Sequence, residues 1–300
     1  MNSLVMPTPR VLGSLGRVGP LAYGTWRCTS GDVAATQALL EEAVDCGMNL
    51  IDTADVYGFD WGGTGFGTVE DLVGAVLAVA PHLRSRIVLA TKGGIVPGVP
   101  YDSSPTALRA ACDASRRRLG VDVIDLYQVH RPDLFTHPAV VAATLAALRE
   151  EGAIREVGVS NHTPAQVAAL TAHLPFALVS NQPEFSALQL APLRDGTLDQ
   201  CMQHGTVPLA WSALAGGRLT TGGVAPPHLV AVLDHLAERE GVDRAAIAIA
   251  FVLAHPSAPV AIIGSQQTAR IRSATAALSV HLDRSDVYAI VQASDGVALP

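Results

Sequence analysis

Short apolar runs alternate with helical segments along nearly the whole chain, and this pattern restricts the possible folds. Eight runs are expected to form strands: Leu21–Trp26, Asn49–Asp52, Ile87–Lys92, Val123–His130, Ile154–Ser160, Ala177–Gln182, Val207–Trp211 and Val260–Ile263. Each is followed by a stretch with helical periodicity. Strands that alternate with helices form parallel sheets with right-handed crossovers. Two architectures remain, a closed (β/α)₈ barrel and an open doubly wound sheet.

The helical segments have recognisable beginnings. They are expected at Asp32–Cys46, Val69–Ala80, Ser104–Leu119, Pro138–Glu150, Pro164–Ala172, Leu193–His204, His228–Glu240, Arg244–His255 and Thr268–Ala276. Asp32, Ser104 and Thr163 are residues that cap helix N-termini. Eight strands favour the closed (β/α)₈ TIM barrel, a fold of about 250 residues. No linker divides the chain, so residues 1–300 are predicted to form a single domain. We expect an N-terminal hairpin before Leu21, at the barrel floor, and a C-terminal helix from Arg284.

Charge and composition exclude several classes of binding partner and site. A net charge of −7 argues against nucleic-acid binding, and Arg116–Arg118 is interpreted as a solvated helix face. The longest apolar stretch, Ala245–Ala254, is too short to cross a bilayer. The four cysteines have no paired spacing and Met1–Arg10 lacks a secretion signal, so we expect reduced thiols, no metal site and a cytoplasmic location. A monomer or weak homo-oligomer is expected.

Polar residues follow the predicted strands at the end where barrel enzymes carry their catalytic groups. Asp52, Lys92 and His130 end three consecutive strands, and Tyr57 lies on the loop after Asp52. Lys92 is the only lysine in a chain with 19 arginines, which favours a chemical role for it over a surface role. The four side chains are therefore predicted to meet at one rim of the barrel.

The chemistry of these four residues can be derived. A buried Lys92 needs Asp52 to compensate its charge. The cation favours the Tyr57 phenolate and is expected to lower a tyrosine pKa that is otherwise about 10. Tyr57 could then act as a general acid on a substrate oxygen to which His130 also donates a hydrogen bond. Alternatively, Asp52 caps a strand end and His130 is a core histidine. These residues supply no hydride.

Together, these residues resemble the aldo-keto reductase family from Leu21 to about Ala277, and in particular its bacterial branch of monomeric oxidoreductases. The matching motifs are Gly24–Trp26, Ile51–Gly58, Ala90–Lys92, Val129–Asp133, Gly158–Asn161, Asn181–Gln182, Ala210–Ser212 and Ile262–Ser265. The resemblance implies a nicotinamide cofactor bound to a barrel, and the glycine-rich stretch Gly58–Gly67 contains no G-x-G-x-x-G motif.

The resemblance also implies a role for each matching residue. Tyr57 is implied as the general acid, tuned by Asp52 and Lys92, with His130 orienting the carbonyl. The substrate is expected to contact Trp26, Trp61, Tyr57 and His130. Ser160, Asn161 and Gln182 are implied to hold the carboxamide, on which Trp211 would stack. The full implied cofactor set is Gly24, Thr25, Trp26, Asp52, Ser160, Asn161, Gln182, Trp211, Ser212, Leu214, Gly216, Arg218, Gly264, Ser265, Gln266, Gln267 and Arg270.

The preference between NADPH and NADH depends on the residues expected to contact the adenosine half of the cofactor. Family members that prefer NADPH often carry a lysine where this chain has Gly264, but Arg270 stands at the position of the usual 2′-phosphate arginine. A guanidinium binds phosphate well. We therefore predict NADPH over NADH, with NADH possible and the margin smaller than a lysine would give.

The predicted activity is the NADPH-dependent reduction of an aldehyde or ketone to an alcohol. The partner is a small-molecule carbonyl compound, with hydrophobic and aromatic compounds favoured and sugars included. Two alternatives stay open. A Schiff-base barrel lyase would use Lys92 as its nucleophile. A non-catalytic nicotinamide-binding sensor would keep the site without appreciable turnover.

Overall fold

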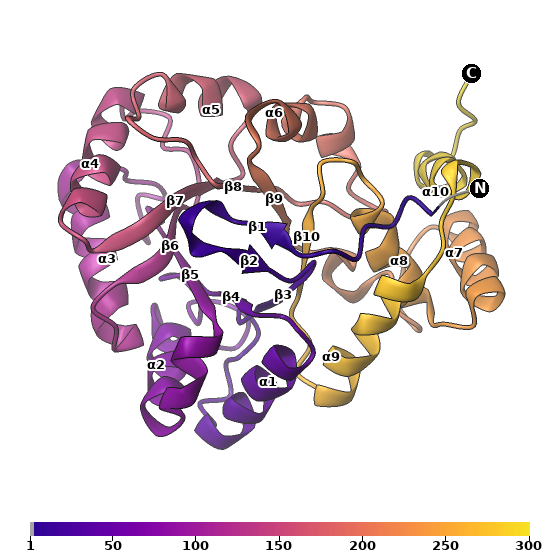
Figure 1. Ribbon diagram of the computed structural model, residues 1–300, viewed down its shortest axis with the longest axis horizontal. Helices are drawn as coiled ribbons and strands as arrows, with labels where there is room; N and C mark the ends of the chain where they lie inside the picture. Colours follow the sequence, from indigo (N-terminus) through magenta and orange to yellow (C-terminus); the bar gives the residue numbers. More distant parts are fainter. Residues whose placement is uncertain (1–2) are drawn as a thin grey trace.

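Eight parallel strands close into a barrel in this protein. The computed structural model describes residues 3–300, and Met1 and Asn2 of the predicted domain lie outside the described residues. Around the barrel the strands follow the order β10 (Val260–Ile263), β3 (Leu21–Gly24), β4 (Leu50–Asp52), β5 (Val88–Gly93), β6 (Ile124–Val129), β7 (Ile154–Ser160), β8 (Ser180–Gln182) and β9 (Val207–Ala210) (Figure 1). The closed (β/α)₈ barrel is confirmed, and the open sheet is excluded.

Helices surround the barrel in Figure 1. They are α1 (Val33–Asp45), α2 (Thr68–Val79), α3 (Pro105–Leu119), α4 (Pro138–Glu150), α5 (Pro164–Thr171), α6 (Thr197–His204), α7 (Pro227–Glu240), α8 (Arg244–Leu253), α9 (Thr268–Ala274) and α10 (Arg284–Asp295). Five short 3₁₀ segments within the described chain are η1 (Gly13–Leu15), η2 (Pro81–Arg86), η3 (Ala191–Leu193), η4 (Ala215–Gly217) and η5 (Thr275–Ser279). No helix among residues 3–300 is long and apolar enough to cross a membrane.

The predicted caps form. Asp32 accepts a hydrogen bond from the Ala35 amide, Ser104 from the Ala107 amide, and Thr163 makes a reciprocal capping box with Gln166. The helix predicted over Leu193–His204 is interrupted. Gly196 adopts a left-handed φ of 85°, so the chain turns there before α6 begins.

A two-stranded hairpin covers the N-terminal end of the barrel, as predicted. Its strands β1 (Arg10–Val11) and β2 (Arg17–Val18) lie across the barrel in Figure 1. Leu12 and Val18 are fully buried in an apolar cluster that includes barrel residues such as Leu50. The Ser14 amide donates to Glu156 Oε1 at 2.8 Å. The floor is therefore filled by side chains, and the open end is the one where the strands finish.

Strand register aligns the polar strand ends. Asp52 on β4 lies opposite Gly24 on β3 and Ala90 on β5, and Lys92 on β5 lies opposite Gln128 on β6. Parallel register thus brings these residues to the same end of the barrel. Alternate strand residues face the same side, so Ala90 and Lys92 both point toward the interior.

Candidate functional site

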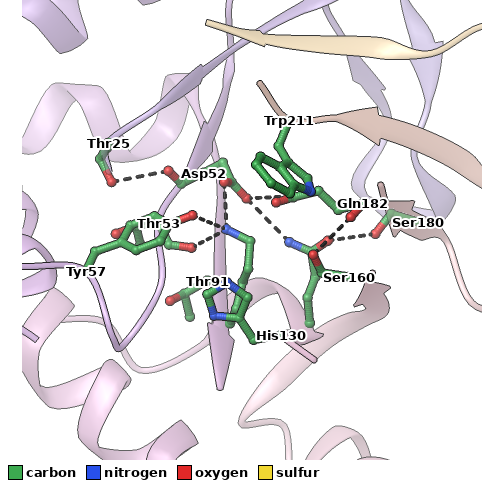
Figure 2. Close-up of polar contacts among 12 residues, drawn as sticks. Thr25, Asp52, Thr53, Tyr57, Thr91, His130, Ser160, Ser180, Gln182 and Trp211 are labelled. Carbon is green, nitrogen blue, oxygen red and sulfur yellow. Dashed lines mark hydrogen bonds and ion pairs between the residues drawn. The ribbon is translucent and has the colours of Figure 1, made fainter. Parts of the chain in front are cut away.

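Asp52, Thr53 and Tyr57 lie close together at the C-terminal end of the strands (Figure 2). Lys92 on β5 is the centre of the buried polar cluster that they form. Its Nζ donates to Asp52 Oδ2 at 2.7 Å, to the Thr53 carbonyl at 2.9 Å and to the Tyr57 hydroxyl at 3.1 Å. The side chain of Lys92 is 0% exposed. All three hydrogen-bond donors of the ammonium therefore have oxygen partners. The predicted meeting of Asp52, Tyr57 and Lys92 is thus present in the structure.

Opposing effects set the proton affinities of this cluster. Burial alone would lower the Lys92 pKa, but Asp52 and Tyr57 outweigh it and raise that pKa above its usual value. Burial raises the Tyr57 pKa, against the lowering effect of Lys92. The net direction for Tyr57 is opposite to the one expected from Lys92 alone, because desolvation of the phenolate exceeds the attraction of the cation. Tyr57 is therefore a protonated hydroxyl at neutral pH.

Two amides support Asp52 from the barrel interior. Gln182 donates from Nε2 to Asp52 Oδ1 at 2.9 Å, and Gln128 does so at 3.4 Å. Ser180 in turn donates to Gln128 Oε1 at 3.3 Å. Both carboxylate oxygens of Asp52 are thus hydrogen-bonded. Gln128 and Ser180 were not predicted as site residues, although Gln128 stands two residues before His130 and so shares its side of the strand.

His130 lies beside Tyr57 as a neutral imidazole. The two ring centroids are 6.0 Å apart in an edge-on arrangement. Burial, with Lys92 and Arg131 nearby, lowers the His130 pKa well below its usual value. Its Nδ1 is buried and has no hydrogen-bond partner among residues 3–300. The ring beside Tyr57 therefore keeps one polar atom that no residue of the described chain uses.

Four further predicted residues form one hydrogen-bonded chain next to this cluster. Ser160 Oγ donates to the Gln182 carbonyl at 3.0 Å, and Asn161 Nδ2 donates to Ser160 Oγ at 2.8 Å. Trp211 Nε1 donates to Asn161 Oδ1 at 3.0 Å, which fixes the indole. Asn161 holds a left-handed φ of 57°, a region where asparagine is enriched among non-glycine residues.

A cleft of about 540 Å³ extends from this cluster to the loop after β10. Many predicted cofactor and substrate residues line it: Gly24, Trp26, Asp52, Tyr57, His130, Ser160, Asn161, Gln182, Trp211, Ser212, Leu214, Gly216, Gly264, Ser265 and Arg270. Arg270 is exposed at the far end and has no ionic or hydrogen-bond partner for its guanidinium in the described chain. The predicted cofactor residues are therefore gathered along one elongated surface.

Five predicted contacts do not line the cleft. Thr25 is fully buried and donates to the Asp52 carbonyl at 3.2 Å. Gln266 donates to the Tyr23 hydroxyl at 3.4 Å, and Arg218 to the Ala215 carbonyl at 3.1 Å. Gln267 precedes α9, and Trp61 stacks behind Trp26. The side chains of Thr25, Gln266, Arg218 and Trp61 thus contact neighbouring residues, which strand-end position alone does not reveal.

Several lining residues were missed at the level of sequence. Arg27, Asp60 and Arg131 lie at the cleft beside residues that were predicted. Thr220 and Thr221 extend the lining toward α8. Arg131 stands within the Val129–Asp133 motif and Arg27 directly after Gly24–Trp26, so their neighbours could have pointed to them. Asp60, Thr220 and Thr221 stand outside the matching motifs, and only the fold brings them to the cleft. Within residues 3–300, no group of three or more His, Cys, Asp or Glu side chains is arranged to hold a metal ion.

Comparison with known proteins identifies the family. The sequence model of the Aldo/keto reductase family matches residues 20–295. A 6-dehydroglucose reductase from Novosphingobium aromaticivorans is 48% identical over 305 residues, covering 100% of both chains. A second 6-dehydroglucose reductase, from Agrobacterium fabrum, is 35% identical over 278 residues, covering 88% of this chain and 90% of the relative.

A solved structure agrees with these relatives. The aldo/keto reductase from Klebsiella pneumoniae in complex with NADP and acetate is 25% identical, with a TM-score of 0.78, over 98% of this chain and 97% of that one. The shared barrel and the full-length sequence matches lead to one assignment. The chain belongs to the aldo/keto reductase family, and it is an NAD(P)H-dependent oxidoreductase.

Proposed function

We propose that this protein reduces the carbonyl group of a small aldehyde or ketone to an alcohol with NADPH, and that Tyr57 is the general acid. The observation that carries the proposal is the contact of Lys92 Nζ with both Asp52 and the Tyr57 hydroxyl. This arrangement fixes the hydroxyl of a protonated tyrosine at the cleft. A proton donor held in place is what carbonyl reduction requires.

The residues of the cleft fit a nicotinamide cofactor. Asn161 Oδ1 accepts one bond, from Trp211, and keeps a second lone pair for a carboxamide N–H. The Trp211 ring lines the same cleft and could stack on a flat heterocycle. At the opposite end, the unpaired Arg270 is suited to a phosphate. This last feature favours NADPH over NADH.

The bound cofactor would supply a hydride to the carbonyl carbon. Tyr57 donates its hydroxyl proton to the carbonyl oxygen, so the product is a neutral alcohol. Lys92 stabilises the resulting phenolate, while Asp52 keeps Lys92 charged and in place. Neutral His130 orients the same oxygen by donating a hydrogen bond from a ring nitrogen. In the reverse direction the phenolate takes the proton back.

The relatives suggest a sugar aldehyde as substrate. Two of them are named 6-dehydroglucose reductases, and 6-dehydroglucose is glucose with an aldehyde at carbon 6. Arg27, Asp60 and Arg131 give this cleft polar groups that could bind hydroxyls. We therefore propose a polyhydroxylated aldehyde over the purely hydrophobic carbonyl compounds favoured by the sequence.

The Schiff-base alternative is disfavoured by the state of Lys92. A lysine nucleophile must be unprotonated, whereas the Lys92 pKa is raised and its ammonium already has three oxygen partners. Borohydride trapping with a carbonyl compound should consequently leave Lys92 unmodified.

Two measurements test the proposal. Titration with NADPH should quench tryptophan fluorescence saturably through Trp211, and more tightly than NADH does. Tyr57→Phe should then lower kcat for 6-dehydroglucose by about 10² to 10⁴ while retaining NADPH binding. Unchanged turnover in this variant would refute the role of Tyr57. NADPH binding without turnover of any carbonyl compound by the wild type would support the sensor alternative.

A further inference from the structure

Two tryptophans from different loops stack at the mouth of the cleft. The ring centroids of Trp26 and Trp61 are 5.1 Å apart, with an interplanar angle of 18°. Trp26 lines the cleft, and its ring centroid lies 6.5 Å from that of Tyr57. Trp61 is 52% exposed and is not part of the lining. Trp61 therefore supports Trp26 from outside the cleft.

Neighbouring polar groups hold this pair in place. Trp26 Nε1 donates to Asp60 Oδ1 at 3.2 Å. The Arg27 guanidinium lies 5.0 Å from the centroid of the Trp61 ring and donates to the Gly216 carbonyl at 2.9 Å. The cluster of Trp26, Arg27, Asp60 and Trp61 thus connects the loops that follow β3 and β4, with a further bond to η4 after β9.

The backbone at Trp61 is unusual. Its φ is 58°, in the left-handed region that bulky residues rarely adopt. Such a conformation has an energetic cost and persists where surrounding contacts determine it. Here Trp61 stacks on Trp26, lies beside the Arg27 guanidinium, and accepts a hydrogen bond at its carbonyl from Thr29 Oγ1 at 3.5 Å. The position of the Trp61 side chain is thus maintained against a local backbone preference.

The surface that Trp26 offers to a ligand follows from these contacts. Asp60 already occupies its indole N–H, and Trp61 covers one face of its ring. The part that remains for the cleft is an apolar face with negative π-electron density. Such a face suits the C–H groups on one side of a saturated sugar ring. Asp60 and Arg131, which also line the cleft, are suited to its hydroxyls.

We propose that Trp61 is a positioning residue that sets the substrate preference of the enzyme. It holds Trp26 as a platform for the ring of a cyclic, polyhydroxylated aldehyde whose carbonyl group reaches Tyr57. The inference rests on the proposed function and adds a determinant that lies outside the cleft. A small acyclic aldehyde gains nothing from this platform, because it has no ring to lie against Trp26.

The test compares two substrates in three variants. We would measure kcat/KM for 6-dehydroglucose and for propanal with NADPH, in Trp61→Ala, Trp61→Phe and the control Phe135→Ala. Phe135 is 99% exposed on the loop after β6 and makes no ring contact within the described chain. Loss of the stack should lower the ratio of the two kcat/KM values in Trp61→Ala about fivefold to tenfold, mainly through KM for 6-dehydroglucose. Trp61→Phe should keep most of the ratio, and Phe135→Ala all of it.

The outcomes separate this inference from the proposed function. An unchanged ratio of the two kcat/KM values in Trp61→Ala would refute the role of Trp61. An equal decrease of this ratio in Trp61→Phe and Trp61→Ala would refute it as well. Wild-type turnover of propanal without turnover of 6-dehydroglucose would also overturn it, while leaving carbonyl reduction intact. Failure of the wild type to reduce any aldehyde would instead overturn the proposed function.

Discussion

At the scale of single residues, the state of Lys92 governs what the cleft can do. A fully buried ammonium needs compensation, and here a carboxylate, a carbonyl and a hydroxyl supply it together. Removing any one partner would leave a buried charge only partly compensated. The cluster therefore combines a structural requirement with a chemical one, since the same bonds that permit burial also hold the Tyr57 hydroxyl.

The pKa directions at the site predict the pH dependence of the reaction. Tyr57 must be protonated to act as an acid, and its pKa is raised, so activity is lost only as pH rises through that higher value. The His130 pKa is lowered, so the ring stays neutral through mildly acidic pH. We expect kcat/KM for carbonyl reduction to stay flat between the ordinary pKa values of histidine, about 6.5, and tyrosine, about 10, and to fall only above that range. A steady-state pH profile checks this, and a one-proton decline near pH 7 would contradict it.

The positions of the proposed catalytic residues could be predicted from the sequence because each stands at or just after the end of an apolar run. Asp52, Lys92 and His130 each end a predicted strand, and this position is visible in the sequence. Gln128 is marked less clearly, because it lies within its strand and not at the end. The direction of the Tyr57 pKa could not be predicted, because it depends on a balance between burial and Coulomb attraction that only the packed structure determines.

At the scale of elements, the type and order of the helices and strands could be predicted from the sequence. The residues at which some strands begin could not, because they depend on pairing with the neighbouring strand. Strand β7 and helix α4 have the predicted limits. Strand β8 begins at Ser180, later than the predicted Ala177, because its pairing with β7 starts at Gly158 opposite Ser180. The apolar run alone does not contain that information. The first residue of a strand is set by where its hydrogen bonds to the neighbouring strand begin, so it depends on both sequences.

The N-terminal hairpin offers a prediction at this scale. Leu12 is fully buried against the strand starts, so Leu12→Ala should lower the free energy of unfolding by about 2 to 5 kcal/mol. Urea denaturation followed by circular dichroism measures this change. The neighbouring Val11 is 62% exposed, and Val11→Ala should change stability by less than about 0.5 kcal/mol. Equal effects of the two substitutions would argue against a packed floor.

At the scale of the whole molecule, the barrel separates stability from chemistry. The hairpin fills one end, while the polar cluster and the cleft occupy the other. Loops from strands distant in sequence meet at the cleft, such as the loops after β3 and β9. Sequence reasoning could predict this division from the fold class, but not which loop residues face the cleft.

Ligand binding should change the stability of the whole molecule in a cofactor-specific way. A ligand that binds only the folded state at 100 times its Kd adds about 2.7 kcal/mol to the free energy of unfolding. We expect NADPH to raise Tm more than an equal concentration of NADH, and Arg270→Ala to remove the difference. Differential scanning fluorimetry measures both shifts. A difference that persists in Arg270→Ala would assign the preference to other residues.

The burial of the chain's only lysine has a further consequence for its covalent chemistry. The folded surface presents no lysine amine, so enzymes that acetylate or ubiquitinate lysine side chains have no target there. Regulation and turnover by those routes would require Lys92 to be exposed first, which means opening the barrel itself. Labelling by an amine-reactive dye, measured on the peptide that contains Lys92, would therefore report the fraction of chains that have lost their structure.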